Sequence, residues 1–207
     1  MNPGILSLVL LVIALILLAS GWKDVILRSI SHKGILLFFV LWLGTSRITV
    51  SHDTYKLNLS FILIAGLAVT LLLRSSGVLA KLHVVSIGLL LGSFYFLLKE
   101  LLSKDPVLIV SRPDVDIAVV LGLVAVLLRR SVALQLACLS MGLVLGELYG
   151  VIWAHKAGTS VLGSASFRDQ WWVALFVARG GALFVQGGAA AGKGLLHLLT
   201  GRGKGGE

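Results

Sequence analysis

The fold class is decided by residues 132–154, VALQLACLSMGLVLGELYGVIWA, an apolar stretch in which Glu147 is the single charged residue. A transmembrane helix needs about 20 consecutive and mostly apolar residues. The apolar run here is continuous, whereas a strand of a membrane barrel alternates polar and apolar residues. The stretch therefore predicts an α-helix that crosses a lipid bilayer.

The composition of the whole chain agrees with this prediction. Hydrophobic residues make up 57% of the 207 residues and charged residues only 13%, whereas soluble domains carry about 25% charged residues. A soluble chain of this length with so few charges could not cover its surface with polar side chains. The composition therefore indicates an integral membrane protein, with the lipid bilayer as its first partner.

Seven apolar stretches are long enough to be spans, and they predict an all-α, polytopic bundle of transmembrane helices without a soluble domain. The stretches 35–51 and 112–128 carry charged residues near one end, so a six-span alternative stays open. Residues 189–207 are predicted to form a basic, glycine-rich cytoplasmic tail. The predicted spans are residues 3–22, 35–51, 57–73, 83–98, 112–128, 132–154 and 171–188.

The basic residues predict the orientation. Lys and Arg outnumber Asp and Glu by 18 to 9, but they stand singly or in short groups between apolar stretches, so we expect no nucleic acid partner. Cytoplasmic connections carry an excess of Lys and Arg. Such an excess, ten against seven, lies in residues 23–34, 74–82, 129–131 and the segment after 188. We therefore expect the N-terminus outside and the C-terminus in the cytoplasm.

Two charged residues fall inside predicted spans, where a charge is costly and suggests a function. Glu147 lies about 10 Å below the outer end of its span, and Arg179 lies about 12 Å below the outer end of the next, at 1.5 Å per residue. Because these two helices are consecutive and antiparallel, the sequence predicts an intramembrane ion pair between Glu147 and Arg179. The pair could fix helix packing or contact a transported substrate.

The span at 132–154 also has a face of small and polar residues, at the 100° spacing of an α-helix. Its three glycines are four residues apart, a pattern that allows a second helix to approach closely. The sequence therefore predicts a helix-packing face, with a ligand path as the alternative. The face comprises Gln135, Cys138, Gly142, Gly146, Tyr149 and Gly150.

Reactive or metal-binding constellations are not evident in the sequence. No two of the five histidines have the spacing of metal ligands, so we expect no metal site and no cofactor. Residues 187–193 imitate a phosphate-binding loop, but Gly194 stands where that motif needs Ser or Thr, so we expect no nucleotide. We therefore expect no enzyme activity.

The sequence favours a non-catalytic membrane subunit or assembly factor that associates with other membrane helices in a homo- or hetero-oligomer. The alternative function is a small transporter or channel component that uses Glu147 and Arg179. A transporter needs a water-accessible cavity that reaches these side chains. In a structural subunit, these side chains should be buried away from water.

The beginning of the chain resembles a known family. The opening MNPGI at residues 1–5, one apolar span, and GWKD at residues 21–24 resemble the start of the YphA-type membrane proteins of spore-forming Gram-positive bacteria. The resemblance implies a multi-pass protein of the bacterial plasma membrane. It implies no activity and no functional residues.

Overall fold

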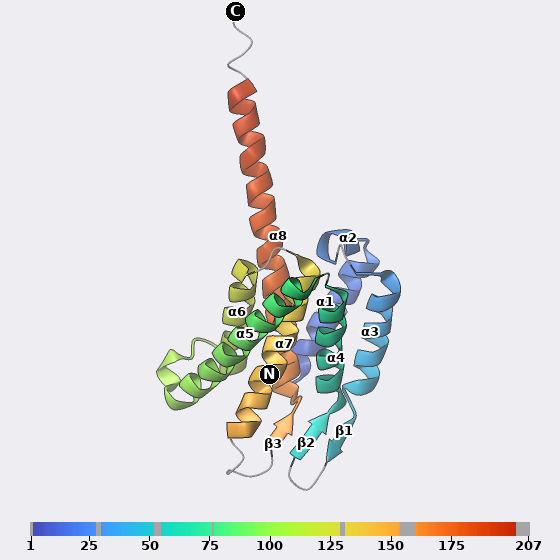
Figure 1. The fold of residues 1–207 in the computed structure, drawn as a ribbon, viewed down its shortest axis with the longest axis vertical. Helices are drawn as coiled ribbons and strands as arrows, with labels where there is room; N and C mark the ends of the chain where they lie inside the picture. Colours follow the sequence, from blue (N-terminus) through green and yellow to red (C-terminus); the bar gives the residue numbers. More distant parts are fainter. Residues whose placement is uncertain are drawn as a thin grey trace, which may run out of the picture.

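The computed structural model of the chain describes residues 2–27, 30–51, 55–75, 77–128, 131–153 and 160–201. Within these ranges the fold is an all-α bundle, and each of the seven predicted stretches corresponds to one long helix (Figure 1). A short helix, α2, and a 3₁₀ turn at Pro106–Leu108 lie in connections. The helices are α1 Ile5–Ala19, α2 Lys23–Ile26, α3 His32–Thr45, α4 Leu59–Arg74, α5 Val78–Lys104, α6 Pro113–Leu128, α7 Val132–Trp153 and α8 Ala165–Gly201.

Three of the predicted stretches have wrong boundaries. The stretch 83–98 is the middle of a longer helix, α5, which runs from Val78 to Lys104. The stretch 35–51 was expected to be helical throughout, but α3 ends at Thr45 and a strand begins at Thr49. Arg47 and the β-branched run from Ile48 to Val50 explain this end, because β-branched residues favour strands. The last span was expected to begin at residue 171, but α8 begins at Ala165 and continues to Gly201. The rest of the predicted tail, residues 202–207, lies outside the described residues.

A small three-stranded sheet joins two connections that are far apart in the sequence. Strands β1 (Thr49–Ser51) and β2 (Tyr55–Asn58) are antiparallel and connect α3 to α4. Strand β3 (Ser160–Leu162), which precedes α8, pairs in parallel with β2. The α3–α4 and α7–α8 connections therefore lie at the same end of the bundle, which we call the sheet end.

Hydrogen bonds place the starts of α1 and α6 at the sheet end of the bundle, beside the start of α8. At the sheet end, Asp169 near the start of α8 accepts a 2.8 Å hydrogen bond from the backbone N–H of Gly4. Gln170 of α8 donates to Asp114 at the start of α6 at 2.8 Å. Helix α2 lies at the opposite end (Figure 1), which we call the α2 end. Successive long helices therefore run in alternating directions.

Helix α7 is the centre of the bundle and packs against α5 and α4, while α6 and α1 pack against α8. Helix α3 packs against α4 and contributes Phe38, Phe39 and Trp42 to an aromatic cluster with Trp171 and Trp172 of α8. The rings of Trp42 and Trp171 stack at 5.4 Å between centroids. This cluster fills the core on the sheet side of the cavity described below.

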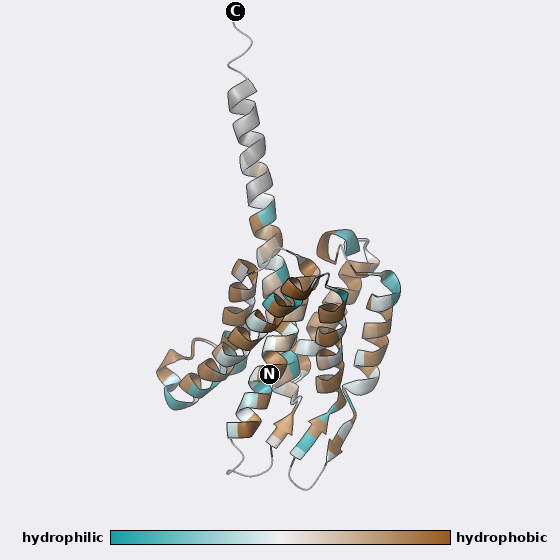
Figure 2. Ribbon diagram, in the orientation of Figure 1, coloured by the Kyte–Doolittle hydropathy of each residue, from teal (hydrophilic) through white to brown (hydrophobic). Residues whose placement is uncertain are grey.

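The outward faces of the helices are apolar. Leu36 and Val40 on α3 are 68% and 59% exposed, and Leu90 on α5 is 60% exposed. Figure 2 shows hydrophobic colouring along most of the coloured helical ribbon of the bundle. Contiguous exposed apolar surface of this extent indicates a membrane interaction. By length and composition, two helices in the described ranges can cross a membrane, Val78–Lys104 and Val132–Trp153, and three shorter apolar helices accompany them, Ile5–Ala19, His32–Thr45 and Leu59–Arg74.

Candidate functional site

Helices α5 and α7 cross in close contact. A Cβ atom added at Gly146 would overlap the ring of Tyr95 and lie 2.8 Å from the carbonyl oxygen of Gly92. A Cβ atom at Gly142 would lie 2.6 Å from the Cβ of Leu91. The two backbones approach so closely that only glycine fits at these positions, which is the geometry that small residues at four-residue spacing allow.

The predicted packing face is divided between two neighbours. Gly142 and Gly146 are buried against α5, and the sulfur of Cys138 lies 3.9 Å from the carbonyl oxygen of Val84 on the same helix. Tyr149 and Gly150 are only half-buried, and a Cβ atom at Gly150 would meet nothing within 4 Å. Gln135 lies apart from this contact, because its side chain is directed toward α6 and α8.

Glu147 belongs to a buried network that we call the Glu147 network. Its Oε2 atom accepts 3.0 Å hydrogen bonds from the Nζ of Lys99 and from the hydroxyl of Tyr95. The Tyr95 hydroxyl also lies 2.7 Å from the Oε1 of Gln170, so two acceptors share one phenolic proton. Gln170 donates in turn to Asp114. The network therefore links α5, α6, α7 and α8.

The burial in this network shows how the charge of Glu147 is tolerated. Glu147 is 5% exposed and Tyr95 is fully buried, whereas the Lys99 side chain is 47% exposed. A lysine at this position can cover apolar surface with its stem while its ammonium group reaches water. The carboxylate is therefore neutralised from the edge of the bundle.

Arg179 belongs to a second buried network near the α2 end. Its Nε donates a 3.0 Å hydrogen bond to the carbonyl oxygen of Ile26, and its Nη1 donates at 3.1 Å to the Oε1 of Gln135. The Nε2 of Gln135 donates to the carbonyl oxygens of Ala125 and Ala178 at 3.2 and 3.3 Å. Gln135 and Arg179 together tie the α2 segment to α6, α7 and α8.

The predicted ion pair between Glu147 and Arg179 does not form. Glu147 pairs with Lys99, and Arg179 has no acidic partner in the part of the chain that the structure describes. The error follows from the start of α8. Arg179 lies fourteen residues beyond Ala165, about 21 Å, whereas Glu147 lies six residues before Trp153, about 9 Å. Gln170, rather than Arg179, is level with Glu147.

A third buried group, Asp169, caps a distant helix. Its carboxylate is 3% exposed and accepts hydrogen bonds from the backbone N–H groups of Gly4 and Ser7, at 2.8 and 2.6 Å. Helix α1 has no side-chain cap of its own. The free N–H groups and positive dipole end of α1 stabilise a carboxylate placed there. Asp169 of α8 therefore stabilises the contact between α8 and the start of α1.

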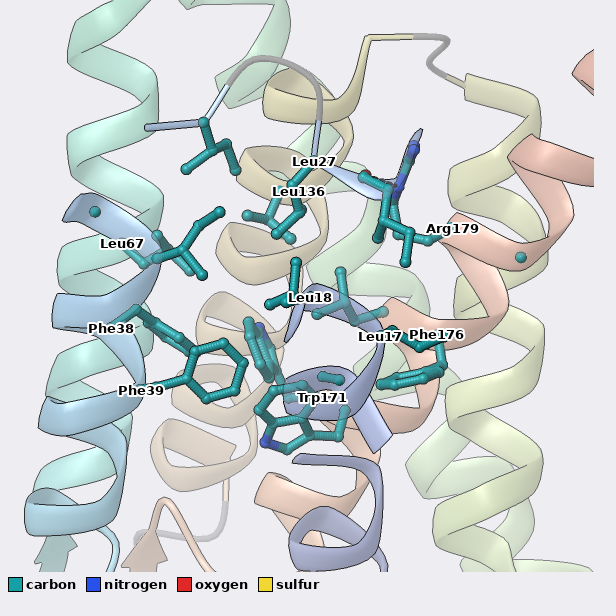
Figure 3. Close-up of a pocket in the computed structure, with 18 of the residues that line it drawn as sticks. Leu17, Leu18, Leu27, Phe38, Phe39, Leu67, Leu136, Trp171, Phe176 and Arg179 are labelled. Carbon is teal, nitrogen blue, oxygen red and sulfur yellow. Dashed lines mark hydrogen bonds between the residues drawn. The ribbon is translucent and has the colours of Figure 1, made fainter. Parts of the chain in front are cut away.

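A cavity of about 220 Å³ lies between α1, α3 and α8 (Figure 3). Leu17 and Leu18 of α1, Phe38 and Phe39 of α3 and Trp171 of α8 are among its apolar lining residues. Arg179 also lines the cavity. The site thus combines an apolar wall with a buried guanidinium group. Among the described residues, no group of three side chains could hold a metal ion.

Five residues of these networks and of the α1 cap were not identified as site candidates from the sequence, namely Tyr95, Lys99, Asp114, Asp169 and Gln170. Lys99 and Asp169 lie close to span ends, where solvation is the ordinary interpretation of a charge. The signal that could have identified Asp169 and Gln170 is their position directly before Trp171. Polar residues there fall on the buried side of the first turns of α8, since all three are at most 3% exposed.

Comparison with protein families matches the chain to the family described as YphA-like integral membrane protein, over residues 3–190. Comparison with curated proteins and with solved structures gives no match. The matched range contains α1 to α7 and α8 as far as residue 190, including both buried networks. The chain therefore belongs to the YphA-like integral membrane protein family.

Proposed function

We propose that the chain is a non-catalytic, seven-span protein of the bacterial plasma membrane that serves as a subunit or assembly factor. The observation that carries the proposal is the use of the buried ionisable groups. Glu147 and Asp169 are each bonded to other helices of the same chain, and Glu147 does not line the cavity next to Arg179. Within the described residues, these groups are bonded inside the bundle and do not line the cavity.

The arrangement of the connections supports seven spans. Because β2 and β3 pair, the α3–α4 and α7–α8 connections lie on one side, so an even number of crossings separates them. In our proposal four helices between these connections each cross once, namely α4, α5, α6 and α7. The bond between Gly4 and Asp169 puts the start of α1 on that same side, which supports a crossing by both α1 and α3.

The lengths of the shorter helices are compatible with this arrangement. Helix α3 has 14 residues and α4 has 16, which gives about 21–24 Å at 1.5 Å per residue. This is less than the roughly 30 Å of a hydrocarbon core. Flanking residues and local thinning of the bilayer accommodate such a difference at modest cost.

The distribution of basic residues supports an external sheet end and a cytoplasmic α2 end. The α2 end carries Lys23 at the start of α2, Lys33 in the first turn of α3 and Arg74 at the end of α4. Cytoplasmic connections are the ones enriched in Lys and Arg. In this orientation the C-terminus is cytoplasmic.

A partner helix would have to use an outward face of the bundle. The crossing at Gly142 and Gly146 is already occupied by α5 of the same chain. Association with other membrane proteins would therefore leave the α5–α7 contact intact and cover apolar surface that otherwise faces lipid.

The test is extraction of the tagged chain from its native membranes in a mild detergent. We expect it to migrate with a defined larger complex, and to carry stoichiometric partner chains after a second affinity step. A chain that migrates at its own mass under the same extraction, with its fold retained, would contradict a role as a subunit.

The alternative function, a small transporter or channel component, is favoured by one observation. The cavity between α1, α3 and α8 reaches Arg179. Its walls are apolar, whereas a path for polar solutes needs hydrogen-bonding groups along its length.

Replacing Glu147 by Gln separates the two functions. Glu147→Gln keeps the contact with Tyr95 and loses the ion pair with Lys99. Because Lys99 is half-exposed and can turn to water, we expect a destabilisation of only about 1 kcal/mol. Abundance in membranes should fall modestly, as measured by immunoblot against total membrane protein. Lys99→Gln should lower the abundance further, because it leaves the buried Glu147 carboxylate without its cation. Unchanged abundance of both variants with loss of a measured solute flux would instead favour the transporter.

A further inference from the structure

The cavity at Arg179 combines length, apolar walls and one charge. Lining residues on α8 run from Trp171 to Leu183, about 18 Å along the helix axis. Arg179 lies near one end, level with Gln135 in the first turns of α7. The space is therefore elongated along the bundle, with its charge toward the α2 end (Figure 3).

The guanidinium group of Arg179 has capacity left for a ligand. Arginine has five N–H donors. Two of them have acceptors among the described residues, the carbonyl oxygen of Ile26 and the Oε1 of Gln135. Both acceptors are uncharged, and the side chain is 5% exposed. A buried cation is stabilised by an anion that completes its hydrogen bonds.

The size of the cavity limits the apolar part of the ligand. A cavity of about 150 Å³ holds one benzene molecule, and pockets for drug-sized ligands measure about 300–1,000 Å³. At about 220 Å³, the space between α1 and α3 fits part of one hydrocarbon chain. It does not fit the two chains of a lipid side by side.

We propose that this cavity binds an anionic phospholipid, with one acyl chain between α1 and α3 and the phosphate on Arg179. Arg179 lies at the depth of Gln135, about 5 Å from the start of α7. This depth fits the boundary between headgroups and acyl chains. Lys33 is adjacent in sequence to the lining residue Gly34 and adds positive charge at that surface, whereas Lys23 is paired with Asp24. Anionic lipids attract basic residues of this kind.

The inference uses the membrane embedding of the chain and does not depend on a role as a subunit. The test is native mass spectrometry of the purified full chain in a maltoside detergent with three probes. These are phosphatidylglycerol, phosphatidylcholine with the same acyl chains, and oleate. We expect phosphatidylglycerol to bind at least tenfold more tightly than either of the others.

Variants on the two parts of the site make the test specific. Arg179→Gln should weaken phosphatidylglycerol binding at least tenfold, and Arg179→Lys should keep part of the binding. Ala14→Phe, which fills the cavity from α1 without changing charge, should also weaken it. Arg74→Gln is the matched control, because Arg74 is exposed at the same end of the bundle and does not line the cavity.

Three results would overturn the proposal. Equal binding of phosphatidylglycerol and phosphatidylcholine would show that the charge of the lipid headgroup does not contribute to binding. Tighter binding of oleate would assign the cavity to free fatty acids. Binding that survives both Arg179→Gln and Ala14→Phe would place the lipid elsewhere, and Ala14→Phe keeps this outcome readable even if Arg179→Gln fails to fold.

Discussion

Replacing Gly146 by Val is expected to lower the free energy of unfolding by about 3 kcal/mol, because overpacking of a tight core has costs of this order. Even the Cβ of the new side chain would overlap the Tyr95 ring and lie 2.8 Å from the carbonyl oxygen of Gly92. Helix α5 would have to move away from α7 and take Lys99 with it. In detergent we expect the melting temperature to fall by roughly 6–12 °C.

Gly150→Val is the matched control for this variant. Gly150 lies one turn beyond Gly146 on the same helix, and a Cβ there meets nothing within 4 Å. Both substitutions change the helix propensity by the same amount, so the difference between them isolates the crossing with α5. Equal melting temperatures for the two variants would show that the α5–α7 contact is looser than described here.

Replacing Asp169 by Ala is expected to detach helix α1 from the bundle. Two charge-assisted hydrogen bonds, from the N–H groups of Gly4 and Ser7, would be lost, and each contributes about 1.5–3 kcal/mol. We therefore expect a destabilisation of about 3 kcal/mol. Faster hydrogen exchange should be confined at first to Ile5–Ala19, as measured by mass spectrometry of peptides.

Asp105→Ala serves as the control for Asp169→Ala. Asp105 also caps a helical turn, by accepting from the N–H of Val107 at 3.3 Å, but it does so at the exposed surface. We expect its loss to have an effect below about 1 kcal/mol. If Asp169→Ala left the exchange of α1 unchanged, the carboxylate would not be what holds this helix.

The helices could be predicted from the sequence because each apolar stretch lies between charged or turn-forming residues. Residues 132–154 predicted α7 to within one residue, since Arg130 and His155 bound an unbroken apolar run. Residues 112–128 predicted α6 equally well, although Asp114 and Asp116 lie in its first turn. Carboxylates are favourable at a helix N-terminus, so these charges mark the start of the helix.

The tertiary contacts could not be predicted in the same way. The pairing of Glu147 with Arg179 was inferred from depth alone, and a six-residue shift in the start of α8 changed the depth of Arg179 by about 9 Å. The partner of Glu147 is Lys99 on α5, which is far away in the sequence. Side-chain packing decides which helix lies against which face. The periodicity of residues within one helix does not carry that information.

The central claim, that the helices cross the bilayer in alternation, is tested most directly by cysteine labelling. Ser111 and Ser131 are exposed and flank α6 at the sheet end and the α2 end, and the native Cys138 is buried. With a membrane-impermeant maleimide on intact cells, Ser111→Cys should react and Ser131→Cys should react only after permeabilisation. Equal labelling of both variants in intact cells, or the reverse pattern, would contradict this account.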